Sequence, residues 1–148
     1  MEIEVTIKEI THEDLVNLLS TTFYGSPTFA PMLCDEYKPL ENRGEGDCYE
    51  DKMANVLLNG GMVAAVDIEY DDEVFENEGV LAVVNDADEA EYRFDLKAVK
   101  KGLKMALESK EDYIRNAACN FLINDGSFDA ADAEVLIQMI IFGEVIYG

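Results

Sequence analysis

Carboxylates are the side chains in this 148-residue sequence whose number and spacing could do chemistry. Between positions 67 and 95 the chain carries twelve acidic residues and one basic residue, Arg93. Such a stretch suits a surface that copies the charge spacing of a nucleic-acid backbone and occupies a basic groove on another protein. The competing interpretation is a solvated surface that only favours solubility. The predicted partner-binding residues are Asp67, Glu69, Asp71, Asp72, Glu73, Glu76, Glu78, Asp86, Asp88 and Glu89.

Cation binding is another chemistry that these acids could support. The segment NDADEAE places acids at Asp86, Asp88 and Glu89, and an EF-hand loop also opens with acids at alternate positions. That loop needs a glycine at its sixth position, and the sequence has none there. We therefore predict no metal site. A cation-binding module, or an enzyme that uses Asp and Glu ligands, is kept as an alternative function.

Catalysis by a nucleophile and a base would have to use His12, the single histidine. It falls in the first turn of an expected helix, where a surface role is the ordinary one. Asp129 and Asp132 form another carboxylate pair, but a helix N-cap and a first-turn acid explain both without chemistry. The sequence has no P-loop and no G-x-G-x-x-G motif. We predict no catalytic residue, no cofactor and no enzymatic activity.

The cysteines and the chain ends bear on location. Cys34, Cys48 and Cys119 are widely spaced and include no C-x-x-C pair, which predicts reduced thiols in a cytoplasmic protein. The N-terminal residues MEIEVTIKEI are acidic and alternating, unlike a signal peptide. The apolar run at 135–147 is shorter than the roughly 20 residues that a membrane-spanning helix needs. We expect no membrane contact.

The whole chain combines an ordinary globular composition with a large acidic excess. Hydrophobic residues make up 49% of the sequence, and the formal net charge is −21. The length fits one domain, so we assign residues 1–148 to a single globular domain. The charge argues against nucleic-acid binding, because Lys and Arg must neutralise the phosphates. A basic protein surface is the natural complement of such a chain.

Hydrophobic periodicity predicts the elements that must position these side chains. Two-residue alternation or short apolar runs predict strands at 3–7, 62–70, 80–84 and 91–96. Helical spacing predicts helices at 12–22, 48–58, 95–110, 111–125 and 130–142, whereas 24–32 and 35–47 are expected to be breaks or loops. This order indicates an α+β domain in which a small antiparallel sheet packs against about five helices.

The last of these helices is apolar nearly all round at residues 135–142. A helix of this kind is buried on most sides, so we expect it at the centre of the core. Gly143 should end it in the left-handed conformation, which glycine adopts without strain. Residues 145–147 should then pack back against the domain. The alternative is that the helix joins two copies in a structural homo-oligomer.

The C-terminal sequence DAADAEVLIQMIIFGEVIYG resembles the ending of small acidic proteins of bacteriophages and bacterial mobile elements. The pattern is D-A-x-x-A, an acid, aliphatic residues with a Gln, and then F-G-E-x-x-Y-G. The matching residues are Asp129, Ala130, Ala133, Glu134, Gln138, Phe142, Gly143, Glu144, Tyr147 and Gly148. The resemblance carries no catalytic residues. It implies a protein of a bacterial cytoplasm and, by analogy, an anti-defence inhibitor that binds a nucleic-acid-processing host protein.

Overall fold

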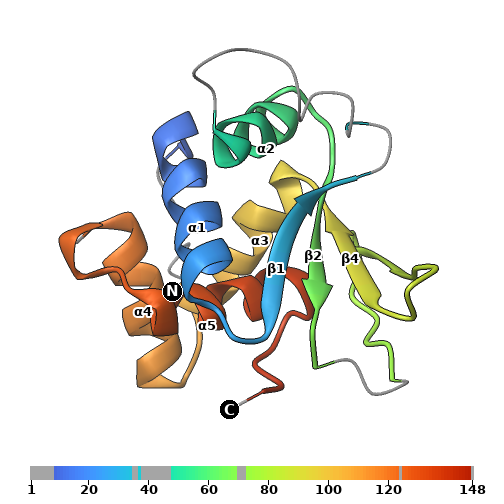
Figure 1. Ribbon diagram of the computed structural model, residues 1–148. Helices are drawn as coiled ribbons and strands as arrows, with labels where there is room; N and C mark the ends of the chain where they lie inside the picture. Colours follow the sequence, from blue (N-terminus) through green and yellow to red (C-terminus); the bar gives the residue numbers. More distant parts are fainter. Residues whose placement is uncertain (1–8, 35–36, 38–47, 70–72, 124, 148) are drawn as a thin grey trace.

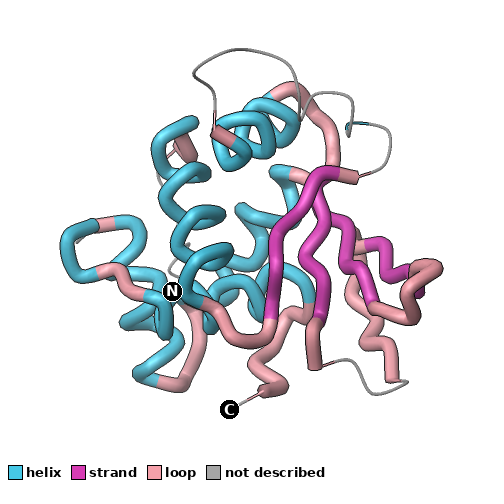
Figure 2. The backbone as a smooth tube through the Cα atoms, viewed as in Figure 1, coloured by secondary structure: helices cyan, strands magenta, loops and turns pink. Residues whose placement is uncertain are grey.

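The computed structural model describes residues 9–34, 37, 48–69, 73–123 and 125–147. These residues form the predicted single α+β domain, with five α-helices and a four-stranded antiparallel sheet. Figures 1 and 2 show the helices gathered on one side of the sheet. The strand predicted at 3–7 and most of the loop predicted at 35–47 lie outside the described residues.

Side-chain caps begin three of the helices. The helices are α1 His12–Gly25, α2 Tyr49–Leu58, α3 Leu96–Leu107, α4 Asp112–Leu122 and α5 Ala130–Ile141, and a 3-10 turn, η2, covers Asp125–Ser127. At α5, Asp129 Oδ1 accepts a hydrogen bond from Asp132 N at 2.9 Å, and Asp132 Oδ2 accepts one from Asp129 N at 3.3 Å. Thr11 begins α1 with the same reciprocal pattern, and Asp95 caps α3. The predicted cap at Asp129 is therefore confirmed.

The sheet has the strand order β1-β2-β4-β3, and every neighbouring pair is antiparallel. The strands are β1 Phe29–Leu33, β2 Val63–Asp67, β3 Leu81–Val84 and β4 Ala90–Phe94. Val63, Tyr92 and Phe94 lie on the face that packs against the helices. In the described part of the chain, β1 and β3 are the two edges of the sheet.

Strand β1 is the element that the sequence prediction missed, because prolines and a glycine interrupt this segment. The prediction of a break at 24–32 is wrong for these residues. Ile68 N donates to Thr28 O at 2.7 Å, so the hydrogen bonds to β2 fall at every second residue from Thr28. Pro31 is one of the residues between, and its nitrogen faces away from β2. A proline there removes no hydrogen bond from the sheet.

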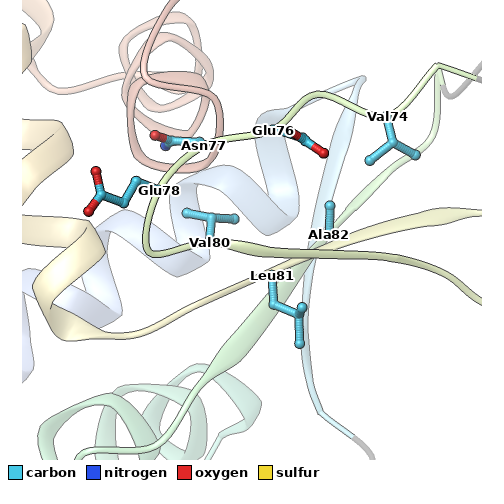
Figure 3. Close-up of a pocket in the computed structure, with 7 residues that line it drawn as sticks. All are labelled: Val74, Glu76, Asn77, Glu78, Val80, Leu81 and Ala82. Atoms are coloured by element: carbon cyan, nitrogen blue, oxygen red, sulfur yellow. The ribbon is translucent and has the colours of Figure 1, made fainter.

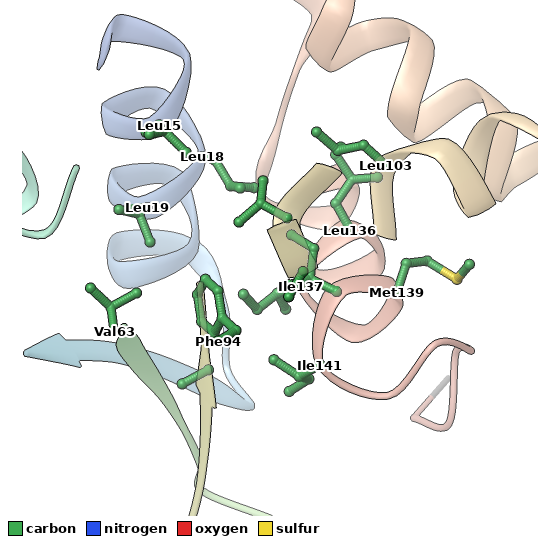
Figure 4. Packing of buried hydrophobic residues seen from close by; sticks show 14 of the residues in the cluster. Leu15, Leu18, Leu19, Val63, Phe94, Leu103, Leu136, Ile137, Met139 and Ile141 are labelled. Atoms are coloured by element: carbon green, nitrogen blue, oxygen red, sulfur yellow. The ribbon is translucent and has the colours of Figure 1, made fainter. Parts of the chain in front are cut away.

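Helix α5 lies at the centre of the core, as predicted. It contacts α1, α3, α4 and β4, and Figure 4 shows Leu136, Ile137 and Ile141 among the buried side chains. It packs closely against α3, where a Cβ added to Gly102 would lie only 2.6 Å from the Ile140 Cα. The absence of a side chain at this glycine is what lets the two helices come together.

The chain after α5 turns back onto the domain. Gly143 has φ +76°, which confirms the predicted left-handed end of the helix. Residues 145–147 pack against the core while Glu144 is exposed, so the predicted arrangement of the tail is also confirmed.

A buried glutamine of α5 holds this tail through its side-chain amide. Gln138 is 1% exposed. Its Oε1 accepts hydrogen bonds from Ile146 N and Tyr147 N, both at 2.8 Å, and its Nε2 donates to Tyr147 O at 3.1 Å. One side chain thus replaces the backbone partners that a strand or helix would have supplied to these groups.

Candidate functional site

The acidic residues before β3 lie on a segment that we call the acidic arm, residues 73–79. The arm joins β3 through a tight turn in which Val80 N donates to Asn77 O at 3.1 Å. Gly79 has φ +87°, as the third residue of a type II turn requires. Asn77 and Val80 form an isolated bridge, and before it the arm is not part of the sheet.

Contacts with α5 and β4 fix the position of the arm. Asn77 Nδ2 lies 3.3 Å from both Ile140 O and Ile141 O, so it donates to carbonyls that the end of α5 leaves without helical partners. Phe75 N donates to Tyr92 Oη at 3.3 Å. The Phe75 ring meets the Phe142 ring edge-on, with centroids 5.3 Å apart. The acidic arm is therefore held in place by its contacts with the C-terminal end of α5 and with β4.

A cavity of about 460 Å³ opens between the acidic arm and the start of β3. Figure 3 shows its lining: Val74, Glu76, Asn77 and Glu78 on the arm, and Val80, Leu81 and Ala82 on the other side. Leu81 is 51% exposed, which is high for an aliphatic strand residue. The cavity therefore has an apolar floor with carboxylates beside it.

The turn between β3 and β4 holds the second group of acids. Asn85 Oδ1 accepts hydrogen bonds from Ala87 N and Glu89 N, each at 2.9 Å, and so fixes the turn. Asp88 has φ +59°, the left-handed conformation that Asp tolerates better than most residues. Asp86, Asp88 and Glu89 are all exposed. Of these three, Glu89 also accepts a hydrogen bond from Asn85 Nδ2, at 3.4 Å.

Most of the predicted partner-binding residues that the structure describes are exposed, and they fall into two groups. The group at the start of β3 contains Glu73, Glu76 and Glu78. The group at its end contains Glu69, Asp86, Asp88 and Glu89, because the register places the end of β2 beside Ala90 and therefore beside the β3–β4 turn. Asp71 and Asp72 lie outside the described residues.

Asp67 is a correction to the predicted set. It is 1% exposed, so it does not present a carboxylate to a partner. Its Oδ2 accepts a hydrogen bond from Tyr147 Oη at 2.8 Å, and its Oδ1 accepts one from Glu69 N at 2.9 Å. Burial raises the pKa of Asp67, although these two hydrogen bonds act in the opposite direction. Asp67 belongs to the contact between sheet and tail, not to the acidic surface.

Arg93, the one base of the acidic stretch, is already partnered. Its Nη2 lies 3.4 Å from Glu91 Oε2, and Asn85 Nδ2 donates to Glu91 Oε1 at 2.9 Å. Glu91 is buried and is held within the sheet. The positive charge of Arg93 is therefore offset locally by Glu91.

The lysines of α3 lie beside a different cavity. It measures about 480 Å³ and is lined by Leu57, Leu58, Gly60, Asp95, Leu96, Lys97 and Lys100. The α3 lysines are exposed: Lys97, Lys100, Lys101 and Lys104. Lys101 Nζ donates to Glu78 O at 3.4 Å. The two cavities therefore carry charges of opposite sign.

The residues weighed for catalysis have structural partners. His12 Nε2 lies 3.5 Å from Asp51 Oδ1 and joins α1 to α2. Hydrogen bonding to Glu50 and Asp51 raises the pKa of the Cys48 thiol, which disfavours the thiolate that a nucleophile needs. Among the described residues, no three His, Cys, Asp or Glu side chains come together as a metal-binding group. The described helices include none long and apolar enough to cross a membrane.

No protein-family model, curated protein or solved structure matches the chain. The resemblance of the C-terminal motif to small acidic phage proteins stays a prediction from the sequence. The surface geometry around β3 is therefore the basis for a functional proposal.

The hydrogen bonds that join the tail to the sheet and to α5 were not predicted from the sequence. Tyr147 was expected to pack against the domain, but its hydrogen bond to Asp67 was not expected, and Gln138 had no predicted contact. A glutamine inside an otherwise aliphatic helix is a signal for such a contact, because a buried amide needs hydrogen-bond partners. Asn77, whose side chain fixes the acidic arm to α5, had no predicted role either.

Proposed function

We propose that this protein is a non-enzymatic binding protein that docks onto a basic surface of another protein. The observation that carries the proposal is the pair of exposed acidic groups at the two ends of β3, together with the cavity beside the first group, which has an apolar floor. A surface of this kind attracts a basic partner over several ångströms and offers apolar area once contact is made. The seven described acids act as the charge pattern, and Leu81 acts as the apolar contact.

The partner class that suits this pattern best is a nucleic-acid-processing protein, whose basic groove the acids would occupy in place of phosphates. The resemblance of the C-terminal motif to phage proteins adds an anti-defence role in a bacterial cytoplasm. Both statements rest on charge and on the motif.

The burial of α5 gives less support to the alternative of a homo-oligomer joined through this helix. Its aliphatic side chains, including Leu136, Ile137 and Ile140, are used within the chain itself and are almost fully buried. A net charge of −21 also opposes the association of two copies in dilute salt.

The test compares two triple variants that remove the same charge. The first is Glu73→Gln with Glu76→Gln and Glu78→Gln on the acidic arm. The control is Glu13→Gln with Glu108→Gln and Glu111→Gln, three exposed acids on α1 and around the α3–α4 connection. Each full-length protein is immobilised and exposed to bacterial lysate at low and at high salt, and the captured proteins are identified by mass spectrometry.

We expect the unmodified chain and the control to capture the same nucleic-acid-binding proteins at low salt, and the arm variant to lose most of that capture. Added double-stranded DNA should displace those proteins, because it competes for the same groove. Equal capture by the arm variant and the control would contradict the proposal, as would capture that neither salt nor DNA reduces.

A further inference from the structure

We infer that the partner contributes an extended segment that pairs with the outer edge of β3, which no described strand covers, and adds a strand to the sheet. The inference rests on the proposed function and specifies its binding mode. The partner segment has apolar residues in its centre and basic residues at both ends. Strand addition of this kind gives affinity through main-chain hydrogen bonds and specificity through alternate side chains.

The alternation of hydrogen bonds along β3 shows which of its backbone N–H and C=O groups point away from β4. Asn85 N donates to Glu89 O at 2.9 Å, so Asn85 points its backbone groups toward the β4 side of the hairpin. Alternation along an antiparallel pair then directs Val83 toward Glu91, and directs the N–H and C=O groups of Ala82 and Val84 away from β4. Within the described residues, the backbone hydrogen bond that falls on this outer edge is the one from Val80 to Asn77.

The arm does not occupy the rest of this edge. After the bridge at Asn77 and Val80, the two segments diverge and leave the cavity of about 460 Å³ between them. Figure 3 shows Val74 and Glu76 on the arm across the cavity from Ala82 on β3. Ala82 has a small side chain, which leaves room for a neighbouring backbone.

The other edge of the described sheet is closed to such pairing. On β1 the outward positions include Pro31, which has no N–H to donate, and Leu33, whose N–H donates to Tyr49 Oη at 2.6 Å. Proline and a bonded N–H protect β1 from strand addition, whereas Ala82 and Val84 of β3 have neither protection from the residues that the structure describes. The contrast points to β3 as the edge that is kept open.

Charge decides between the candidate occupants of this edge. A second copy paired through β3 would bring the two sets of acids together, including Glu76, Glu78 and Asp86, and like charges at close range oppose such a contact. A segment with basic ends places its cations beside these acids instead. Its apolar centre would cover Leu81 and Val84, which are 51% and 47% exposed.

The experiment uses the full chain and a synthetic peptide with two lysines at each end and alternating valine and threonine between them. Two further peptides carry N-methyl groups on the odd or on the even central residues, with the same charge. Affinities are measured by calorimetry at low salt, and backbone amide shifts are followed by NMR. We expect one N-methylated peptide to bind at least tenfold more weakly than the unmodified peptide and the other to bind nearly as well, because only one set of peptide N–H groups faces the protein.

A protein variant tests the same edge from the other side. Ala82→Pro removes an outward N–H and copies the protection that Pro31 gives to β1, without touching the hydrogen bonds between β3 and β4. We expect at least a tenfold loss of peptide affinity, with Ala82→Ser as the control that keeps the N–H. Thermal melting establishes that the variant is folded, and the methylated peptides decide the question if it is not.

The outcomes separate this inference from the proposed function. If both N-methylated peptides bind as well as the unmodified one, or if both lose affinity equally, strand addition is wrong. Salt-sensitive binding that the arm variant Glu73→Gln, Glu76→Gln, Glu78→Gln abolishes would then still support the proposed function. No binding of the unmodified peptide would contradict the inference, and the capture from lysate would then decide the proposed function by itself. Dimerisation of the protein alone that Ala82→Pro abolishes would assign the edge to a second copy and overturn the inference.

Discussion

Tyr147 connects the end of the chain to the end of β2 through a single hydrogen bond to Asp67. Burial and the neighbouring carboxylate raise the pKa of the Tyr147 phenol well above its usual range, because both disfavour the phenolate. The neutral phenol is therefore the form that the folded state stabilises. The contact links two residues that are 80 positions apart in the sequence.

We predict that this phenol makes the protein lose stability at alkaline pH. A group whose pKa is higher in the folded state contributes stability below its unfolded pKa, about 10 for tyrosine, and loses it as the pH rises further. Replacing Tyr147→Phe should lower the free energy of unfolding at pH 7 by about 1–3 kcal/mol, because Asp67 loses a partner while buried. The gap between the variant and the unmodified chain should narrow above pH 10, as measured by denaturant unfolding.

The control for this prediction is Tyr113→Phe, since Tyr113 is 52% exposed and lies on α4. That variant should retain the alkaline loss of stability. If Tyr147→Phe changed neither the stability at pH 7 nor its decline above pH 10, the hydrogen bond to Asp67 would have no energetic role.

At this scale the sequence predicted the caps but not the buried acid. A cap and its target are three residues apart, so Asp95 and Asp129 were recognisable from local pattern alone. Asp67 has the same local pattern as the exposed acids that follow it. Only the distant Tyr147 reveals that its carboxylate is buried, and no local periodicity contains that information.

Among the elements, the crossing of α3 and α5 depends on the absence of a side chain at Gly102. A Cβ there would lie 2.6 Å from Ile140 Cα and 2.8 Å from Ile140 N, and backbone atoms cannot move aside as a flexible side chain would. We predict that Gly102→Ala lowers the free energy of unfolding by about 1–3 kcal/mol, even though alanine favours helix formation. For a domain of this length each kcal/mol lowers the melting temperature by about 2–4 °C.

A glycine in open space provides the comparison for that substitution. A Cβ at Gly126, in η2, would meet no atom within 4 Å, so Gly126→Ala should melt close to the unmodified protein. Equal melting temperatures for the two alanine variants would mean that α3 and α5 can separate without cost.

The tail after α5 is the second element on which stability depends. Deleting residues 144–148 removes the packing of residues 145–147 and leaves the buried side chains of Gln138 and Asp67 without these partners. Each orphaned group costs about 1–3 kcal/mol, and the lost apolar burial adds to this. We predict a fall in melting temperature of about 6 °C or more, measured by circular dichroism. A truncated chain that melts like the full one would show that the tail is a free peptide.

The helices were easier to predict than the sheet. Each helix carries its apolar residues at regular spacing, and α5 is so apolar that only a central position accommodates it. Strand β1 has no such pattern, because a proline fits it only at a residue whose nitrogen points away from the neighbouring strand. Which residues point away follows from the pairing with β2, and the sequence of β1 alone does not show that pairing.

Over the whole molecule, the core and the acidic surface are built from separate sets of residues. The core uses the aliphatic side chains of all five helices and of one sheet face, whereas the arm acids are directed to solvent. The clustering of acids in the sequence therefore predicted most of the candidate surface. The cavity and the outer edge of β3 could not be predicted, because they depend on where the arm and the strand diverge in the described part of the chain.

We predict that the arm acids can be removed without loss of stability. The triple variant Glu73→Gln, Glu76→Gln, Glu78→Gln should melt at the same temperature as the unmodified chain or higher at low salt, since it relieves self-repulsion. High salt should reduce any difference, because exposed charges are screened within about 10 Å. A large fall in melting temperature would show that these carboxylates are structural, and the variant would then be unsuitable as a test of binding.

The hydrogen bonds between Gln138 and residues 146–147 should slow the exchange of these two backbone amides with heavy water. Residues 146 and 147 belong to no helix or strand, and amides in such segments ordinarily exchange fast. Here both N–H groups donate to the buried Oε1 of Gln138, at 2.8 Å each. Exchange therefore requires that these two hydrogen bonds to the central helix break. We predict that these two amides exchange as slowly as those of α5 itself, and that Gln138→Leu makes them exchange as fast as a free peptide. Exchange followed by NMR would then report the opening of the core from the last residues of the chain.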